Sequence, residues 1–128
     1  MRILLDTHVL LWAMGSSRRL PLAARSLILD VSNDVFYSAA SVWELAIKST
    51  LRRGDFSVDL PALVRALSRS GFSELPVTSA HAVRVPALPA IHRDPFDRLL
   101  VAQSLTEPMT LLTNDAVLAG YGPTVQLV

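Results

Sequence analysis

Cysteine is absent from this chain of 128 residues, and lysine occurs only once, at Lys48. Without cysteine, disulfide bonds and thiolate metal sites are excluded, and a reducing compartment is consistent with the composition. No apolar run approaches the length of a membrane-spanning helix. The apolar run at the N-terminus is interrupted by Asp6 after three residues, which is too short for a signal peptide. We therefore expect a soluble, cytoplasmic protein without a membrane partner.

An excess of charge of one sign is also lacking, because 12 basic and 11 acidic residues leave a formal net charge of +1. This balance does not by itself indicate a nucleic-acid-binding protein. All the basic residues except Lys48 are Arg, which binds phosphates in bidentate fashion, although a coding bias toward Arg is the simpler explanation. The apolar fraction of 51% is ample for one core, whereas charged residues reach only 18%, so a partner or a second copy is expected to cover part of the surface.

Short apolar segments alternate with helical segments along the chain. Strands are expected at residues 1–5, 35–38, 72–77, 109–112 and 125–127, and helices at 8–14, 21–32, 41–53, 60–70, 79–85 and 94–106, with a loop at 86–89. Apolar strands without alternation are typical of a parallel sheet that helices cover on both faces. We predict a single α/β domain over residues 1–128, with about five short, mostly parallel strands and a ligand site at their carboxyl ends.

Five acidic residues lie where a strand is expected to end or a helix to begin: Asp6, Glu44, Asp94, Asp97 and Asp115. Each has a purely structural interpretation as well, because Asp caps helices, and Glu44 follows Ser41 at the spacing of a capping box. Asp94 and Asp97 have the same spacing. Four gathered carboxylates, however, are unfavourable without a cation, because like charges raise one another's pKa. A site of oxygen ligands suits Mg²⁺ or Mn²⁺, which also accept phosphate oxygens.

Zinc is not expected in this site. The chain lacks Cys, and His8, His81 and His92 do not have the spacing of zinc ligands. We interpret His81 as a surface or core residue and His92 as a loop residue. The direction in which His8 points cannot be deduced from the sequence.

Four segments resemble, in their order and spacing, the motifs of PIN-domain nucleases, and specifically the VapC-type toxins of bacterial type II toxin–antitoxin pairs. They are residues 3–12, 38–48, 91–103 and 111–115, which together span nearly the whole chain. Each motif alone is weakly specific, whereas four in order are a specific signature. By this resemblance the four acidic residues of the family correspond to Asp6, Glu44, Asp97 and Asp115, so none is missing. Asp94 corresponds to an additional carboxylate that many members carry.

The resemblance implies a Mg²⁺- or Mn²⁺-dependent endoribonuclease that hydrolyses RNA phosphodiesters with a metal-activated water. Asp6, Asp97 and Asp115 would bind the metal, and Glu44 would orient or deprotonate the water. Supporting roles fall to Thr7, Asp94 and Thr113, of which the two threonines would donate hydrogen bonds to a carboxylate or a phosphate. The resemblance also implies an RNA substrate, a cognate antitoxin protein that covers the active site, and a homodimer.

Three alternatives remain open at this point. The first is a housekeeping RNA-processing PIN nuclease without an antitoxin, against which a small upstream antitoxin gene would argue. The second is an acidic pocket that binds metal or a basic peptide without catalysis, which a metal-dependent cleavage assay would decide. The third is a phosphate-receiving signalling domain, which needs a Lys near its last strand, whereas Lys48 lies on a mid-chain helix.

Overall fold

All strand pairings in the central sheet are parallel. The computed structural model describes residues 1–51 and 58–128, and within them the sheet has five strands in the order β3-β2-β1-β4-β5. The strands are β1 (Arg2–Leu5), β2 (Asp34–Ser38), β3 (Ser73–Leu75), β4 (Thr110–Thr113) and β5 (Val125–Leu127). Each pair of neighbours runs in the same direction. The predicted α/β class with about five short parallel strands is confirmed.

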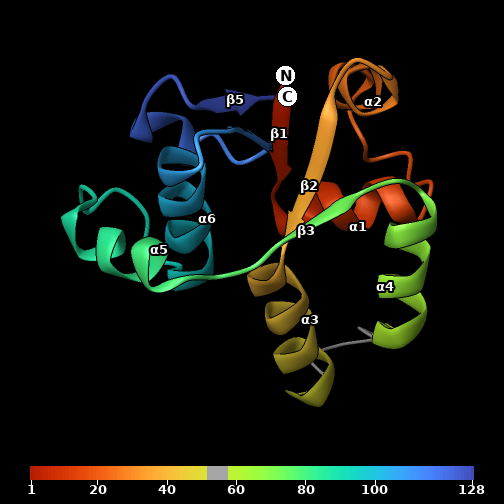
Figure 1. The fold of residues 1–128 in the computed structure, drawn as a ribbon, viewed down its shortest axis with the longest axis horizontal. Coiled ribbons are helices and arrows are strands. Elements are labelled where there is room, and N and C mark those ends of the chain that lie inside the picture. The colour runs from red at the N-terminus through yellow and green to blue at the C-terminus, as the bar shows by residue number, and fades with distance from the viewer. Residues whose placement is uncertain (52–57) are drawn as a thin grey trace.

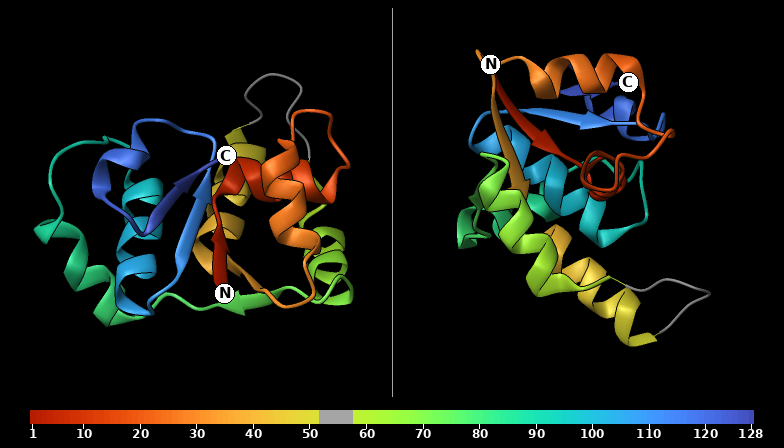
Figure 2. Two further views of the ribbon diagram at one scale, coloured as in Figure 1. Left: turned by 90° about the horizontal axis from the view of Figure 1, so that it is seen from above. Right: turned by 90° about the vertical axis from the view of Figure 1, so that its right-hand side faces the viewer.

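Helices cover both faces of this sheet. In the described part of the chain they are α1 (Thr7–Met14), α2 (Leu22–Leu29), α3 (Ala39–Leu51), α4 (Leu60–Arg69), α5 (Ser79–Arg84) and α6 (Pro95–Thr106), with 3₁₀ turns η1 (Val85–Ala87) and η2 (Leu118–Tyr121). Figure 1 and Figure 2 show α5 and α6 on one side of the sheet and α1, α2 and α4 on the other. Helix α3 continues from the carboxyl end of β2, so its first turns lie at the edge where a ligand site is expected.

The central strand β1 separates two hydrophobic cores. Ile3 and Leu5 belong to the core beneath α1, α2 and α4, whereas Leu4 belongs to the core beneath α6. None of these three side chains has exposed surface. Successive side chains of a strand point to opposite faces of the sheet, so a strand that is covered on both faces must be apolar throughout. The first polar side chain after β1 is therefore that of Asp6, at the carboxyl edge of the sheet.

The boundaries of several elements differ from the sequence expectation. Helix α3 begins at Ala39, two residues early, because the Ser38 hydroxyl accepts a hydrogen bond from the backbone N–H of Ala40 (3.0 Å) and the strand passes directly into the helix. Helix α2 ends at Leu29, since Asp30 accepts from the N–H of Ser32 (2.9 Å) and turns the chain. Strand β3 is shorter than predicted, and the loop expected at residues 86–89 begins inside η1. The predicted end of the third helix, at Arg52, Arg53 and Gly54, lies outside the described residues.

Candidate active site

Asp6 occupies the junction between β1 and α1, and its side chain is buried. One carboxylate oxygen, Oδ1, accepts from the N–H of Val9 (2.8 Å) and caps α1, while Oδ2 accepts from the hydroxyl of Thr113 at the end of β4. Burial raises the pKa of Asp6, the bonds to Thr113 and Val9 oppose this, and the charge of Asp115 adds to it. The capping interpretation is therefore correct for Asp6, and the same carboxylate also joins two neighbouring strand ends.

Glu44 lies inside α3 rather than at its start, so the predicted capping box with Ser41 is wrong. Its side chain is buried, and both oxygens have tertiary or helical partners. Oε1 accepts from the hydroxyl of Thr7 (2.8 Å), and Oε2 forms an ion pair with the ammonium group of Lys48 (2.8 Å). The Thr7 hydroxyl also lies 3.0 Å from that of Ser41. These contacts hold the Glu44 carboxylate against the residue that follows Asp6.

The N-terminus of α6 carries two carboxylates with different local roles. Asp94 is the N-cap, and its Oδ1 accepts from the N–H groups of Phe96 (2.8 Å) and Asp97 (3.3 Å). Asp97 lies in the first turn, where the helix dipole favours negative charge. The Asp97 side chain does not return a bond to the backbone of Asp94, whose N–H donates instead to Nδ1 of His92 (3.0 Å). Only one half of the expected capping box is thus formed.

Burial and nearby charges govern the ionisation of Asp97. Burial raises its pKa to about 7, the charge of Asp94 adds to the shift, His92 opposes it, and Asp6 and Glu44 add to it further. Charges act on one another in this way only at short range. The carboxylates of Asp94, Asp6 and Glu44 therefore all lie within electrostatic range of Asp97.

Asp115 completes the cluster from the turn that follows β4. Its N–H donates to the hydroxyl oxygen of Thr113 (3.0 Å), and its Oδ1 accepts from the N–H of Val117 (2.9 Å). Oδ2 lies 2.9 Å from Nε2 of His92, which is 3.5 Å from Oδ2 of Asp97. Although burial raises the pKa of Asp115, its bonds to His92 and Val117 lower it overall. As predicted, both Thr113 and Thr7 donate to carboxylates.

The donor set of this cluster fits a hard divalent cation. Among the described residues, one ligand atom each from His92, Asp97 and Asp115 lie within 4.8 Å of one another, a group that does not include Asp6 or Glu44. Burial, and after it the neighbouring carboxylates, raise the pKa of Asp97, and a bound cation would oppose both effects. The sequence interpretation did not include His92 in the site, and Lys48 was considered only as a helix residue.

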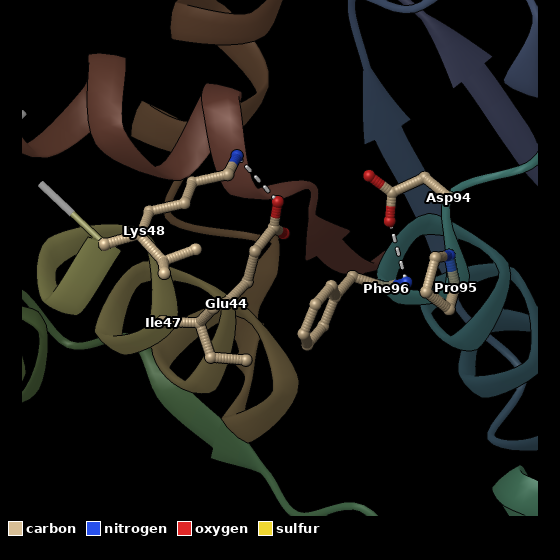
Figure 3. A pocket seen from close by; sticks show the side chains of 7 residues that line it. Glu44, Ile47, Lys48, Asp94, Pro95 and Phe96 are labelled. Atoms are coloured by element: carbon tan, nitrogen blue, oxygen red, sulfur yellow. Dashed lines mark hydrogen bonds and ion pairs between the residues drawn. The ribbon is translucent and has the colours of Figure 1, made fainter. Parts of the chain in front are cut away.

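A pocket opens beside these carboxylates. Figure 3 shows it between α3, which contributes Glu44 and Lys48, and the start of α6, which contributes Asp94 and Phe96. The rest of its lining is apolar and comes from Ile47, Leu51 and Pro95. The pocket thus reaches two of these carboxylates, those of Glu44 and Asp94, from the side of α3.

Fold and site together define an α/β protein with an acidic cluster of the metal-binding type at the carboxyl edge of a parallel sheet. The chain belongs to the PIN-domain family, whose model matches residues 3–122. It is 28% identical over 120 residues to Ribonuclease VapC22 of Mycobacterium tuberculosis, and the alignment covers 93% of this chain and 91% of that protein.

Two solved structures share the fold. VapBC2 from Rickettsia felis, in a crystal structure with a DNA fragment from the promoter, contains a chain that matches with a TM-score of 0.68 at 16% identity, covering 100% of this chain and 98% of that one. FitAcB from Neisseria gonorrhoeae matches with a TM-score of 0.59 at 20% identity, covering 91% and 89%. In the described residues, no helix combines the length and apolarity needed to cross a membrane.

Proposed function

We propose that this PIN domain is a Mg²⁺- or Mn²⁺-dependent endoribonuclease that acts as the toxin of a toxin–antitoxin pair. The observation that carries the proposal is the convergence of Asp6, Glu44, Asp97 and Asp115 from four separate elements. The similarity to a protein named as a ribonuclease supports the activity, and the fold shared with VapBC2 supports the biological role. Such an enzyme would act on RNA in the cytoplasm.

We assign the metal to oxygen atoms of Asp6, Asp97 and Asp115. When bound, the ion would lower the pKa of a coordinated water and neutralise charge on the phosphodiester. Thr113 holds Asp6, and the backbone N–H of Asp115 is bonded to the same hydroxyl, so two of the three assigned ligands share one anchor. The Thr113 hydroxyl therefore contacts both of these residues, beside the backbone bond from the N–H of Asp6 to the carbonyl oxygen of Leu112 (3.1 Å) that joins β1 and β4.

We assign to Glu44 the role of orienting or deprotonating the attacking water. Thr7 fixes one of its oxygens, and the other, now paired with Lys48, is the atom that would accept a proton from the water. The ammonium of Lys48, whose side chain is 41% exposed, would then be close to the phosphate of a bound RNA. Attack by water predicts products with a 5′-phosphate and a 3′-hydroxyl. A 2′,3′-cyclic phosphate would contradict this assignment, because it requires attack by the ribose hydroxyl.

The proposal is tested by incubating purified protein with total cellular RNA in Mg²⁺, Mn²⁺ or EDTA. We expect discrete cleavage that requires metal and is lost in Asp6→Asn. Asn caps helices as well as Asp does, so the variant retains the cap of α1 while losing the charge. Asp59→Asn is the matched control, since Asp59 caps α4 in the same way and lies outside the acidic cluster. Cleavage that persists in EDTA or in Asp6→Asn would contradict the proposal.

The toxin role and the homodimer need separate measurements. We expect expression of the chain to arrest bacterial growth, Asp6→Asn to abolish the arrest, and co-expression of the protein encoded next to it to restore growth. Metal-dependent cleavage without growth arrest would favour a housekeeping RNA-processing enzyme. Light scattering of the purified protein is expected to give twice the mass of one chain, and a monomer at all concentrations would contradict the dimer.

A further inference from the structure

In the part of the chain that is described, His92 is the histidine whose ring lies within contact distance of the acidic cluster, whereas His8 influences Asp6 and Asp115 only through its charge. Its Nε2 lies 2.9 Å from Oδ2 of Asp115 and 3.5 Å from Oδ2 of Asp97. An imidazole in this position can act in two ways. It can bind the cation through a lone pair on Nε2, or it can donate a hydrogen bond from Nε2 to a carboxylate that binds the cation.

The other ring nitrogen decides between these two roles. Nδ1 of His92 is 3.0 Å from the backbone nitrogen of Asp94. A backbone N–H can only donate, so Nδ1 must offer its lone pair and cannot carry a proton. A neutral imidazole then carries its proton on Nε2, and that N–H is directed at Asp115. In this arrangement Nε2 has no lone pair for a metal ion.

The backbone of His92 is held as firmly as its ring. Its N–H donates to the hydroxyl oxygen of Tyr121 (3.0 Å), which also accepts from Nη1 of Arg98 (3.2 Å). The Arg98 guanidinium further donates to the carbonyl oxygens of Pro89 (2.9 Å) and Val85 (3.0 Å). A lone pair on Nε2 would require the proton of the neutral ring to be on Nδ1, which would break the hydrogen bond from the N–H of Asp94. Moving the whole residue would break the hydrogen bond to Tyr121.

A second histidine in the chain has the same arrangement without any metal site. Nδ1 of the fully buried His81 accepts from the backbone N–H of Thr78 (3.0 Å), and its Nε2 contacts the carboxylate of Glu107. There the imidazole links the carboxylate of Glu107, at the end of α6, to the backbone at the N-terminus of α5. His81 is therefore an internal reference for the donor role.

We propose that His92 is a positioning residue that donates from Nε2 to Asp115 and does not itself bind the divalent ion. The inference rests on the proposed function in assuming that a divalent ion binds. Asp115 then has one oxygen bonded to Val117 and the other to His92, which fixes the plane of the carboxylate and leaves a lone pair on each oxygen for the ion. An all-oxygen set favours Mg²⁺ or Mn²⁺ over Zn²⁺.

Nuclear magnetic resonance of ¹⁵N-labelled protein tests the protonation state directly. Long-range ¹H–¹⁵N correlations should show His92 protonated on Nε2 in the metal-free protein, with the pattern of His81, and unchanged when Mg²⁺ is added. Loss of the Nε2 proton on addition of Mg²⁺, or a proton on Nδ1 in the metal-free protein, would overturn the proposal. Absence of Mg²⁺ binding would contradict the proposed function, and the metal-free spectrum would still decide the donor role.

Mn²⁺ titration calorimetry of variants gives a second readout. His92→Gln keeps an N–H donor and should retain the Mn²⁺ affinity within about threefold, whereas His92→Leu should weaken it about tenfold or more, as loss of an outer hydrogen bond does. Tyr121→Phe keeps the His92 ring and removes the hydroxyl that accepts from the His92 N–H and from Arg98, and it should weaken the affinity by about threefold. His81→Gln is the control and should leave the affinity unchanged. Equal, severe loss in the Gln and Leu variants would show that His92 is a ligand.

Discussion

Among the acids of the site, Asp97 has a pKa that burial and the neighbouring carboxylates raise far above its ordinary value. Its pKa is raised to about 7, first by burial and then by Asp94, whereas in the unfolded chain the pKa returns to the ordinary aspartate value of 3.8. Between these two values the folded protein binds a proton that the unfolded chain releases, so the metal-free fold loses stability as pH rises through this window. Below it the carboxyl is neutral in both states, and above it the full penalty is present.

Removing the charge of Asp97 should therefore stabilise the metal-free protein at high pH. We expect Asp97→Asn to increase the free energy of unfolding by about 2 kcal/mol at about pH 8 and to change it little at about pH 4, because one pKa unit corresponds to about 1.4 kcal/mol and the side chain is partly exposed. Urea denaturation at a series of pH values in EDTA measures this. Asp59→Asn should show no such dependence, and destabilisation by Asp97→Asn at high pH would show that the charge is needed by the fold.

At the same scale, the positions of the candidate acids were predictable and their hydrogen-bond partners were not. Asp6 and Asp115 follow apolar segments, and parallel strands bring their carboxyl ends to one edge, so the sequence pattern was enough. The two oxygens of Glu44 instead bond to Thr7 and Lys48, and this tertiary contact overrode the local capping spacing. His92 meets Asp115 only because a loop without periodicity returns to the turn after β4.

Among the elements, the N-terminus of α6 combines helix capping with the candidate chemistry. Asp94 caps the helix through one oxygen, Pro95 begins it, and Asp97 points from its first turn into the cluster. Proline is favoured at the first helical position because its missing N–H would have had no partner there. The orientation of Asp97 therefore depends on a correctly formed first turn.

Two substitutions of Asp94 separate its cap from its charge. Asp94→Asn keeps an acceptor for the N–H groups of Phe96 and Asp97 and should retain stability and cleavage, whereas Asp94→Ala should lower the free energy of unfolding by about 1 kcal/mol and reduce cleavage. Asp59→Ala removes the equivalent cap of α4 and should cost about the same with no effect on cleavage. Loss of cleavage in a stable Asp94→Asn protein would instead identify Asp94 as a metal ligand.

The apolar pattern predicted which segments are helices and which are strands. Single polar side chains determine where several of the helices begin and end. Ser38 starts α3 early and Asp30 ends α2 early, each through one side-chain bond to the backbone. Such side-chain bonds replace helical backbone hydrogen bonds over only two or three residues. The apolar pattern that predicts a helix repeats over a longer stretch, so it does not detect them. This is why the sheet was predicted correctly while several helix limits were not.

For the whole molecule, the site joins residues from Asp6 to Asp115, so only the complete fold can bind the ion. A ligand that binds the folded state alone stabilises it by about 2.7 kcal/mol at about 100 times its Kd. We expect Mg²⁺ to raise the Tm by several degrees, EDTA to reverse the shift, and Asp97→Asn to abolish most of it, all measurable by differential scanning calorimetry. A Tm that is independent of Mg²⁺ and Mn²⁺ would contradict a metal site.

The central position of β1 has a consequence for the order of events during translation. This strand precedes the other four strands in the sequence and so leaves the ribosome before them, yet one of its two neighbours, β4, is made only at residues 110–113. A nascent chain can pair β1 with β2 and still lack Asp97, Thr113 and Asp115. The acidic cluster would thus be complete only after Asp115 has been made, so a nascent chain that ends before this residue could not attack the transcript and the ribosome that are making it.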